Sequence, residues 1–595
     1  MDAPNRNMLW ARALVDELAR GGVTAACVSP GSRSTPLTVA FAEHEDIQVF
    51  SHLDERSAAY FALGRARRTG EVTPLVCTSG TAAANYHPAV LEADQSRVPL
   101  LALTADRPPE LRDSGANQTA DQEKLYGDAV RWYTDLPEPE AEPRKLRSLR
   151  TTVARALAEA EGTNAGPVHL NCPFRKPLEP VEVPGDVPEQ LEALAAEGRT
   201  AGSATTARGG SRAKPAFVER RAGEMELADE DIRAIADELA VERGLIVAGP
   251  ADPTEIDPES IVALSHATGF PILADALSGL RFGGHTRVAP VLGGYDGYLA
   301  EAVTANWPEP ETVLRMGASP TSKPLRKYLA RSGARQIVVD PAGGWREAEF
   351  TATDLVTADP SRLAAALSRV ITGPDSADWR QYWAEAEQTH WDAVDEQAEL
   401  FEGGILAETV ERAPEPTTLF VSNSMPVRDL DRFASPSPDA VTALGNRGVS
   451  GIDGITSTAL GAGSATTDDL TLVIGDLAYY HDMNGLLAVT RCDVDATIVI
   501  INNDGGGIFH MLPIESFDPP FTAQFKTPHG LDFEPSSELY GLEYARVESR
   551  DAFTEAYSEA VHSDGSHIVE VVIDAADSHA IRDELEEQVI EALSA

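Results

Sequence analysis

The sequence predicts an α/β protein made of three domains, each built around a parallel β-sheet. Short apolar runs recur along the chain, and many of them end in a Gly-, Ser- or Pro-containing turn that leads into a segment with helical spacing. A strand, a helix and a second strand in this order form a unit whose two strands lie parallel in one sheet. A chain of 595 residues is also long enough for three or four domains with cores of their own.

The first predicted domain covers residues 1–185. Apolar spacing from Leu9 to Leu18 predicts a helix that ends at Gly21-Gly22. The predicted strands of this domain are residues 25–28, 75–78, 100–104 and 167–170. Alternation of such strands with helices is typical of a parallel-sheet domain.

Two further domains are predicted after a linker. Residues 186–225 are expected to form a flexible linker or surface insertion, because residues 195–222 are rich in small polar residues. A middle α/β domain should cover 226–375, and a third parallel-sheet domain should cover 376–595. The predicted strands here are residues 245–248, 313–316, 336–339, 418–421, 472–474, 497–501 and 568–573.

The third domain is expected to open with a helical segment. Residues 376–402 have helical character and contain Trp379, Trp383 and Trp391. Large aromatic side chains at such positions most simply pack in a core or an interface.

The most informative pattern is a pair of polar groups at two predicted strand ends. Asp476 follows one apolar run, Asn503 follows the next, and a helix is expected between them over Asp482–Thr490. The carboxyl ends of parallel strands are where open α/β sheets bind ligands. A carboxylate, an amide oxygen and a backbone carbonyl suit Mg²⁺, and glycines at 505–507 let the backbone approach a phosphate. Ordinary helix-capping turns are the alternative for either group alone.

These groups resemble the signature of the thiamine diphosphate enzymes, which is Gly-Asp-Gly followed at this spacing by Asn-Asn. Leu477 stands in place of the second glycine, as in one branch of that family, the 2-succinyl-5-enolpyruvyl-6-hydroxy-3-cyclohexene-1-carboxylate synthases of menaquinone biosynthesis. The resemblance continues across nearly the whole chain in family order. The matching blocks are Ser29-Pro-Gly-Ser-Arg-Ser-Thr-Pro36, Asp54-Glu55-Arg56-Ser57-Ala58, Thr104-Ala-Asp-Arg-Pro108, Gly115-Ala-Asn-Gln118, Ser422-Asn-Ser424 with Arg428, and Asn446-Arg-Gly-Val-Ser-Gly-Ile-Asp-Gly454.

The resemblance implies a cofactor site for thiamine diphosphate and Mg²⁺, with Mn²⁺ as the alternative ion. Glu55 would bond the pyrimidine and favour the tautomer that removes the thiazolium proton, although a lone Glu at a helix start can also simply favour the dipole. The implied metal ligands are Asp476, Asn503 and Gly505. The implied cofactor-binding residues are Glu55, Ser424, Met425, Ile452, Gly475, Asp476, Leu477, Asn503, Gly505, Gly506, Ile508 and Phe509.

The resemblance also implies a substrate site rich in arginine. Fixed guanidinium groups suit carboxylates, whereas surface pairing with acidic residues is the alternative for any one arginine. In the middle domain Lys323 matches the family, and either Arg281 or Arg326 would take the place of an arginine that does not align. The implied substrate-binding and catalytic residues are Ser32, Arg33, Glu55, Arg107, Gln118, Lys323, Ser424, Arg428 and Arg447.

Composition limits the partners and the compartment. Asp and Glu number 94 against 49 Lys and Arg, a net charge of −45, which argues against nucleic-acid binding and favours adaptation to high salt. No apolar run of membrane-spanning length occurs, and the N-terminus lacks the apolar core of a signal peptide. The four widely spaced cysteines are expected to be core residues in a reducing cytoplasm. In the resembled family the two domains that meet over one cofactor belong to different subunits, so the resemblance implies a homodimer or a tetramer.

The function that the resemblance implies is decarboxylation of 2-oxoglutarate and 1,4-addition of the succinyl carbanion equivalent to isochorismate. Another thiamine diphosphate carboligase, such as an acetohydroxyacid synthase, is the nearest alternative, but it needs fewer cationic contacts. A catalytically silent subunit is disfavoured because Glu55, Asp476 and Asn503 are all present. A dinucleotide-binding oxidoreductase is disfavoured because no Gly-x-Gly-x-x-Gly follows an N-terminal strand with an acidic residue at the right distance.

Overall fold

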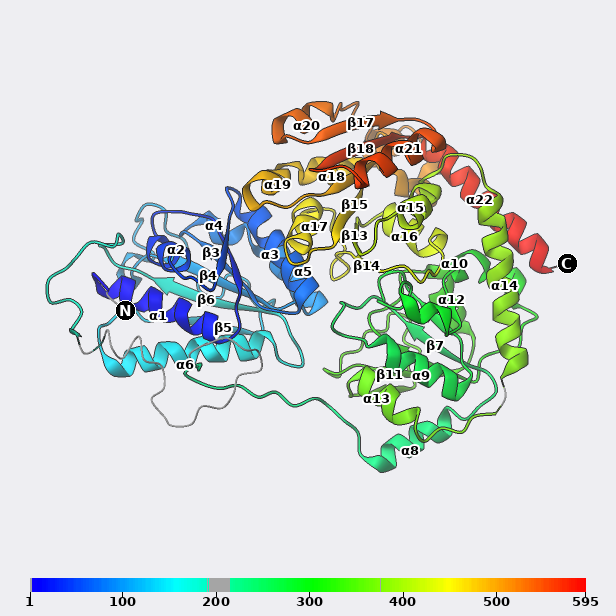
Figure 1. The fold of residues 1–595 in the computed structure, drawn as a ribbon, viewed down its shortest axis with the longest axis horizontal. Helices are drawn as coiled ribbons and strands as arrows, with labels where there is room; N and C mark the ends of the chain where they lie inside the picture. The colour runs from blue at the N-terminus through cyan, green and yellow to red at the C-terminus, as the bar shows by residue number, and fades with distance from the viewer. Residues whose placement is uncertain (1–2, 190, 192–214, 375, 595) are drawn as a thin grey trace.

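Three six-stranded parallel sheets form the framework of the molecule (Figure 1). The computed structural model describes residues 3–189, 191, 215–374 and 376–594. Every neighbouring pair of strands within the three sheets is parallel, which confirms the predicted fold class. Of the predicted linker, residues 190 and 192–214 lie outside the described part of the chain.

The N-terminal sheet has the strand order β2-β1-β3-β4-β6-β5. Its central strands are buried along their whole length, as expected for parallel strands covered on both faces. The strands are β1 (Ala25–Val28), β2 (Gln48–Ser51), β3 (Thr73–Cys77), β4 (Leu100–Asp106), β5 (Trp132–Asp135) and β6 (Pro167–Pro173). The helices are α1 (Arg6–Arg20), α2 (Thr35–Ala42), α3 (Glu55–Thr69), α4 (Thr81–Ala84), α5 (His87–Ser96) and α6 (Pro143–Ala160), with a short 3₁₀ turn η1 (Pro109–Leu111).

The middle sheet has a different strand order, β12-β11-β10-β7-β8-β9. Its strands are β7 (Gly244–Ala248), β8 (Ile272–Ala274), β9 (Val291–Leu292), β10 (Thr312–Met316), β11 (Arg335–Val339) and β12 (Asp354–Val356). The helices are α8 (Asp229–Glu238), α9 (Pro258–Thr268), α10 (Tyr295–Tyr298), α11 (Glu301–Thr304), α12 (Lys323–Arg331) and α13 (Pro360–Leu367), with the 3₁₀ turn η2 (Gly284–Arg287).

The C-terminal sheet has the order β14-β13-β15-β16-β18-β17. Its strands are β13 (Thr417–Val421), β14 (Val441–Leu444), β15 (Asp469–Gly475), β16 (Thr497–Asn502), β17 (Glu543–Val547) and β18 (His567–Val572). The helices are α14 (Ala377–Glu396), α15 (Glu402–Glu411), α16 (Met425–Phe433), α17 (Ile455–Gly463), α18 (Asp476–His481), α19 (Leu487–Cys492), α20 (Glu534–Tyr540), α21 (Arg550–Val561) and α22 (Ala575–Ser594). Short helical turns are η3 (Met483–Leu486), η4 (Gly507–Met511), η5 (Pro513–Ser516) and η6 (Thr522–Lys526).

The helix expected over Asp482–Thr490 differs from the observed segment. The chain turns helical at Asp476, directly after β15, and continues as α18, η3 and α19. The break lies at Asp482, whose buried carboxylate accepts a hydrogen bond from the backbone N–H of Ser457 at 2.7 Å. Because the Asp482 side chain bonds to the backbone of the neighbouring helix α17, the helical segment is interrupted between α18 and η3.

The N-terminal and C-terminal domains share one hydrophobic core. Residues of both sheets, of α3 and of α17 belong to a single buried cluster. Helices α3 and α17 approach closely because glycine faces the other backbone on each side. A Cβ on Gly64 would lie 1.8 Å from the Thr458 carbonyl oxygen, and one on Gly461 would lie 1.9 Å from that of Phe61. This crossing fixes the N-terminal domain against the third sheet.

Helices α14 and α22 run side by side along the middle and C-terminal domains (Figure 1). Trp379 and Trp383 are buried in a cluster with residues of the middle sheet and of α22, so the prediction that they pack in a core is confirmed. The indole N–H of Trp391 donates to the Glu387 carboxylate at 2.8 Å. The four cysteines are buried and free, and among the described residues no helix has the length and apolar character needed to cross a membrane.

Candidate active site

The C-terminal sheet has its crevice between β13 and β15, where the strand order reverses. Ligands of open α/β sheets bind at such a switch point, beyond the carboxyl ends of the strands. Ser424 follows β13, Asp476 follows β15, and Asn503 follows the neighbouring strand β16. The sequence folds this way because each apolar run stops at a small or polar residue that begins a turn.

Asp476 and the glycine segment after β16 are in direct contact. The Asp476 carboxylate is buried, and its Oδ2 accepts from the backbone N–H of Gly505 at 2.9 Å and lies 3.1 Å from His529 Nε2. Its Oδ1 accepts from the backbone N–H of Leu477 at 2.6 Å. Burial raises the pKa of this carboxyl, and the hydrogen bonds oppose that rise. A bound cation would stabilise the charged form.

Asn503 has one free acceptor. Its Nδ2 donates to Glu402 Oε1 at 2.7 Å, whereas its Oδ1 is buried and has no hydrogen-bond partner. An unpartnered buried oxygen is costly unless an ion or a ligand satisfies it. No group of three His, Cys, Asp or Glu side chains suited to a metal occurs in the described part of the chain. The residues therefore fit Mg²⁺, which takes few protein oxygens and completes its shell with waters and phosphate.

The glycine segment brings backbone close to backbone. Gly505 has φ +141°, and a Cβ there would lie 2.0 Å from the Lys526 carbonyl oxygen. A Cβ on Gly506 would lie 2.7 Å from the Phe525 carbonyl oxygen. Ile508 and Phe509 follow in η4, where the Phe509 ring meets the Phe525 ring edge-on at 5.5 Å. Only glycine fits these positions, and the missing side chains let the backbone of the loop come close to a ligand.

Ser424 has a strained backbone. Its φ of +74° is rare outside glycine, and such strain is concentrated at functional sites. It is the N-cap of α16, and Met425, the first residue of that helix, is buried. Arg428 comes soon after the predicted strand 418–421 but lies within the helix α16, and its guanidinium donates to the Ser424 carbonyl oxygen. The short helix thus holds Arg428 over the switch point.

Arg447 lies in the loop between β14 and α17, which also contains Ile452. Its Nη1 donates to Asn423 Oδ1 at 2.7 Å. The Asn423 Nδ2 in turn donates to the carbonyl oxygens of Asn446 at 2.7 Å and Gly451 at 2.8 Å. Asn423 therefore links the loop to the end of β13 and orients Arg447.

Arg326 is electrostatically coupled to these two arginines. Burial lowers the pKa of Arg428, and Arg447 and Arg326 lower it further by repulsion. Burial likewise lowers the pKa of Arg447, with a contribution from Arg326. Arg326 lies on α12 and pairs with Glu349 at 2.9 Å. Repulsion from neighbouring cations at Arg428 and Arg447 indicates a locally cationic site, which suits an anion.

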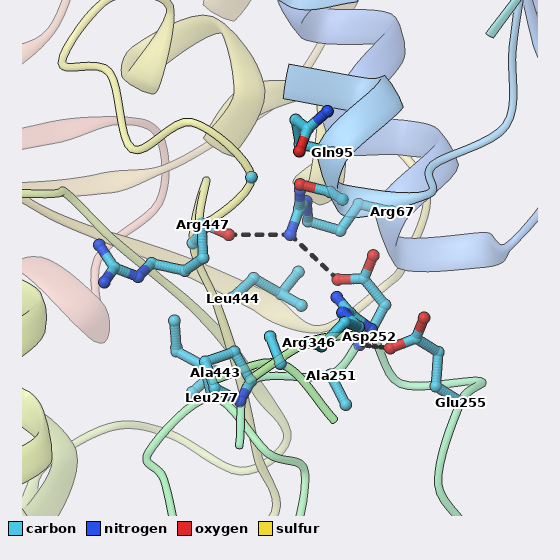
Figure 2. Close-up of a pocket in the computed structure, with 15 residues that line it drawn as sticks. Arg67, Gln95, Ala251, Asp252, Glu255, Leu277, Arg346, Ala443, Leu444 and Arg447 are labelled. Atoms are coloured by element: carbon cyan, nitrogen blue, oxygen red, sulfur yellow. Dashed lines mark hydrogen bonds and ion pairs between the residues drawn. The ribbon is translucent and has the colours of Figure 1, made fainter. Parts of the chain in front are cut away.

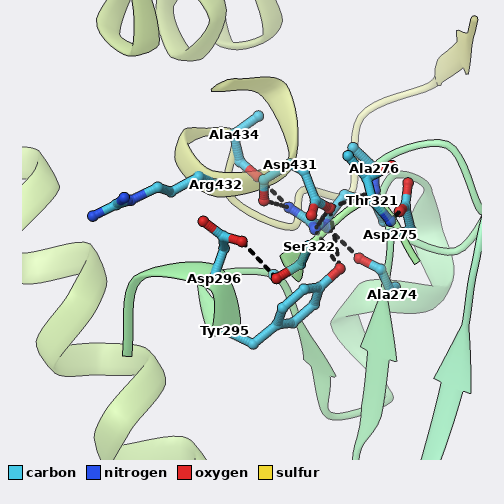
Figure 3. Close-up of polar contacts among 12 residues, drawn as sticks. Ala274, Asp275, Ala276, Tyr295, Asp296, Thr321, Ser322, Asp431, Arg432 and Ala434 are labelled. Carbon is cyan, nitrogen blue, oxygen red and sulfur yellow. Dashed lines mark hydrogen bonds and ion pairs between the residues drawn. The ribbon is translucent and has the colours of Figure 1, made fainter. Parts of the chain in front are cut away.

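Arg281, the other middle-domain alternative, does not fit a substrate site. It is fully buried, and its contacts join Ala274 of the middle domain to Asp431 and Ala434 of α16 and its C-cap; Figure 3 labels these three partners. Nε donates to the Ala274 carbonyl oxygen at 2.8 Å, Nη1 to those of Asp431 and Ala434, and Nη2 to Asp431 Oδ1 at 2.9 Å. Because protein groups use its donors, Arg281 is a structural residue.

Lys323 begins α12. Its side chain is exposed at the first position of the helix, directly after the N-cap Ser322. It is on the same helix as Arg326, less than one turn away.

The N-terminal sheet carries a second group of predicted residues at its own strand ends. Arg33 is buried, donates from Nη1 to the Phe174 carbonyl oxygen at 2.6 Å, and has its pKa lowered by burial and by Arg107. Gln118 has φ +53° and exchanges hydrogen bonds with Ser79 beside β3. Ser32 is exposed in the turn after β1.

Glu55 is the first residue of α3 and is half-buried. Asp54 caps the helix by accepting from the backbone N–H of Arg56. Arg56 Nη2 donates to the His481 carbonyl oxygen at 2.9 Å, so the start of α3 lies against the end of α18. The structure thus places Glu55 at a junction of the N-terminal and C-terminal domains.

The two groups of predicted residues stay separate within one chain. Among the described residues, no hydrogen bond or ion pair joins Ser32, Arg33, Arg107 or Gln118 to the group around Arg428, Arg447, Asp476 and Asn503. Glu402, Asn423 and His529 contact site residues but were not predicted. Only Asn423 carried a signal, because it lies inside the Ser422-Asn-Ser424 block.

Comparison with known proteins identifies the class. Three models of thiamine pyrophosphate enzymes match the chain in order: the N-terminal TPP binding domain at residues 8–125, the middle domain at 217–421 and the C-terminal TPP binding domain at 438–571. These matches follow the three sheets, and they agree with a site built on the ends of the third.

Closely similar relatives narrow the class to one family. The chain is 62% identical to the 2-succinyl-5-enolpyruvyl-6-hydroxy-3-cyclohexene-1-carboxylate synthase of Halorubrum lacusprofundi, over 100% of this chain and 99% of the relative. It is 63% identical to that of Haloarcula marismortui over 100% of both chains, and 48% identical to that of Roseiflexus castenholzii over 96% and 97%. The chain belongs to the family of 2-succinyl-5-enolpyruvyl-6-hydroxy-3-cyclohexene-1-carboxylate synthases.

Proposed function

We propose that this chain decarboxylates 2-oxoglutarate and adds the remaining four-carbon unit to isochorismate, giving 2-succinyl-5-enolpyruvyl-6-hydroxy-3-cyclohexene-1-carboxylate for menaquinone biosynthesis. The observation that carries the proposal is the pairing of two features at one sheet edge. A buried carboxylate and an unpartnered amide oxygen lie beyond β15 and β16, and Arg428 and Arg447 follow β13 and β14 at the same edge of the sheet. The relatives' name fits this pairing, because both substrates are anionic.

Asp476, Asn503 Oδ1 and the Gly505 carbonyl oxygen hold Mg²⁺, with Mn²⁺ as the alternative ion. Glu402 fixes the Asn503 amide by accepting from Nδ2, and Oδ1, which has no hydrogen-bond partner, would be the ligand of the ion. The glycines at 505–507 would let the backbone come close to the diphosphate. Bound here, thiamine diphosphate supplies an electron sink and its own internal base.

The arginines bind and orient the carboxylates of the substrates. Arg428, Arg447 and Arg326 form one cationic group, and Arg33 and Arg107 form the other, with Ser32, Gln118 and Ser424 as hydrogen-bonding companions. Among the middle-domain cations, Arg326 supplies the guanidinium, because Arg281 is already satisfied by protein groups. Lys323, nearby on α12, adds a second positive charge.

Glu55 holds the proton that is exchanged with the cofactor, in a site completed by a second copy of the chain. The minimum assembly is a homodimer, and a tetramer is a pair of such dimers. Large apolar side chains that flank the predicted site residues are 51–66% exposed in the single chain, which supports their burial by a second copy. They are Leu53, Val449, Tyr480, Met511 and Phe517. The free buried cysteines support a reducing cytoplasm.

Mass spectrometry of the products tests the function directly. The full-length chain is incubated with 2-oxoglutarate, isochorismate, thiamine diphosphate and Mg²⁺ at molar salt. We expect consumption of both substrates and a product that combines isochorismate with the succinyl unit. Replacing 2-oxoglutarate by pyruvate is the matched control, and a product from pyruvate alone would favour an acetohydroxyacid synthase instead.

A further inference from the structure

The loop that carries Arg447 is held by the N-terminal domain. This Arg447 loop comprises residues 445–454, between β14 and α17, and contains Ile452 as well as Arg447. Part of its support comes from its own domain, through Asn423. The rest comes from three side chains of the N-terminal domain, namely Tyr60 and Arg67 on α3 and Glu92 on α5.

Glu92 accepts two backbone hydrogen bonds from the Arg447 loop. Its Oε1 accepts from the N–H of Gly448 and its Oε2 from the N–H of Val449, each at 2.7 Å. Ser96 Oγ also donates to Oε1 at 2.7 Å. The carboxylate is 1% exposed, although its partners lie in a segment more than 350 residues away. Charge-assisted hydrogen bonds to a buried carboxylate are among the stronger ones in proteins.

Arg67 holds the other side of the same turn. Its Nη1 donates to the Gly445 carbonyl oxygen at 2.8 Å and pairs with Asp252 at 3.2 Å (Figure 2). Its Nη2 lies 3.4 Å from Glu92 Oε1, so the two residues form a buried ion pair. The ion pair of Arg67 and Glu92 thus holds the Gly445 carbonyl, which precedes Arg447, and the Gly448 and Val449 amides, which follow it.

The side chain of Arg447 points the other way. Figure 2 shows its guanidinium extending away from Arg67 and Asp252. The backbone beside it has little freedom, because a Cβ on Gly448 would lie 2.6 Å from the Glu92 carbonyl oxygen and from Ser96 Oγ. A turn held this closely on one side fixes the direction of the side chain on the other.

We propose that Glu92, paired with Arg67, is a positioning residue that sets the reach of Arg447 into the substrate site. The inference rests on the proposed function, in which Arg447 binds a substrate carboxylate. Glu92 touches neither substrate nor cofactor and acts through the Gly448 and Val449 amides. Its loss lets the loop shift, so Arg447 no longer meets its carboxylate at hydrogen-bonding distance.

The test compares Glu92→Ala, Glu92→Gln and Arg447→Ala with the unchanged enzyme. The relevant substrate is the one whose KM rises in Arg447→Ala. For Glu92→Ala we expect its KM to rise about tenfold, the scale of one lost charge-assisted hydrogen bond, with a much smaller change in kcat. Glu92→Gln retains one acceptor and the shape of the side chain, so its KM should lie between. If Glu92→Ala does not fold, the KM of Glu92→Gln tests the inference instead.

A double-mutant cycle separates positioning from general damage. Adding Glu92→Ala to Arg447→Ala should change KM by less than about twofold, because the residue through which it acts is already absent. Thiamine diphosphate affinity, measured by calorimetry with Mg²⁺, should stay unchanged. Glu159→Gln, which removes a carboxylate from an exposed i,i+4 pair with Arg155, is the matched charge control.

Three outcomes would overturn the inference: an unchanged KM in Glu92→Ala, an equal rise with and without Arg447, or a loss of cofactor affinity that reports collapse of the whole loop. Failure of the proposed function looks different. In that case the unchanged enzyme forms no product, or Arg447→Ala alters neither KM.

Discussion

The N-terminal and C-terminal sheets have the same strand order, yet they carry different chemistry. If the strands of each domain are numbered along the chain, both sheets read 2-1-3-4-6-5. Strand ends that correspond can therefore be compared directly. After the third strand the N-terminal sheet has Ser79 and the C-terminal sheet has Asp476, and after the fourth they have Arg107 and Asn503.

The difference lies in the few residues that follow each strand. After the third and fourth strands, the C-terminal sheet offers oxygens that suit a cation, whereas the N-terminal sheet offers the Ser79 hydroxyl and the Arg107 guanidinium, which suits a carboxylate. After the second strands the charges are reversed, since the N-terminal strand leads to Glu55 and the C-terminal strand leads to Arg447. One framework therefore supplies two half-sites, and function follows from the loops rather than from the fold.

The largest expected effect concerns the cation site, which only the C-terminal sheet is proposed to have. Asp476→Ala should abolish Mg²⁺-dependent binding of thiamine diphosphate, because the only carboxylate among the proposed ligands is lost. Calorimetry with and without Mg²⁺ measures the effect. Asp504→Asn is the control, since it changes a largely exposed neighbour that accepts from the Gly530 N–H. If Mg²⁺-dependent binding of thiamine diphosphate were unchanged in Asp476→Ala, the proposed cation site on the C-terminal sheet would be wrong.

The second prediction concerns the contribution of the N-terminal sheet to the chemistry. Glu55→Gln keeps the shape of the side chain but cannot exchange a proton. Exchange of the C2 proton of the cofactor, followed by NMR in deuterated water, should slow by about 100-fold, the scale of a lost acid–base group. Cofactor affinity should persist, because the proposed metal and diphosphate ligands lie on the other sheet.

Glu71→Gln provides the control for that measurement, since Glu71 is an exposed residue just beyond the far end of α3. Exchange at the unchanged rate in Glu55→Gln would make Glu55 an ordinary helix-start residue.

A smaller effect is expected from the middle domain, which faces the C-terminal half-site. Arg326→Met should raise the KM of an acidic substrate by about tenfold, the cost of one lost charge-assisted contact. Lys323→Met, on the same helix but more exposed, should raise it less. Steady-state kinetics of both variants decides the order. A larger rise of KM in Lys323→Met would mean that Lys323, rather than Arg326, is the main substrate-binding cation of α12.

Most central strands were predictable from the sequence, but the three-residue strand β8 and the edge strands were not. A parallel strand buried on both faces reads as a continuous apolar run, as in β1, β4 and β16. The edge strands β2, β5, β12 and β17 are half-exposed and carry mixed sequences, so no run marks them.

The candidate site divides in a similar way. Motifs identify Asp476 and Asn503 because short local patterns surround them. Glu402 and Glu92 support the site from 101 and 356 positions away from their partners, and neither lies in a pattern. Their roles depend on burial and on contacts between elements that only the folded chain brings together.

A further prediction concerns electrostatic self-repulsion, which acts on the N-terminal and C-terminal domains alike. With a net charge of −45, self-repulsion opposes folding, and salt screens it within a Debye length of about 10 Å at 0.1 M. The melting temperature should therefore rise by several degrees as KCl is increased from 0.1 M towards molar concentration. Differential scanning fluorimetry across this range measures it. A melting temperature that is flat or falls with salt would contradict adaptation to high salt.

The smallest expected effect tests the junction between the two domains through His52. The imidazole follows β2, its ring centroid lies 4.7 Å from that of Phe61 with the two rings tilted, and its Nε2 lies 3.8 Å from Cys492 Sγ of the C-terminal domain. Burial lowers the pKa of His52 to about 4, from an ordinary value of about 6.5. The unfolded chain therefore binds more protons between these two values, so the stability that this neutral imidazole contributes is complete above about pH 6.5 and is lost as the pH falls towards 4.

His52→Gln cannot take up that proton. Its urea midpoint, measured from pH 4.5 to 7.5 at constant high salt, should fall less steeply with acid than that of the unchanged protein. The difference should be modest, because His169 and His390 have pKa values lowered by burial in the same way and still titrate. Parallel acid profiles for the two proteins would mean that His52 is not held neutral at the junction.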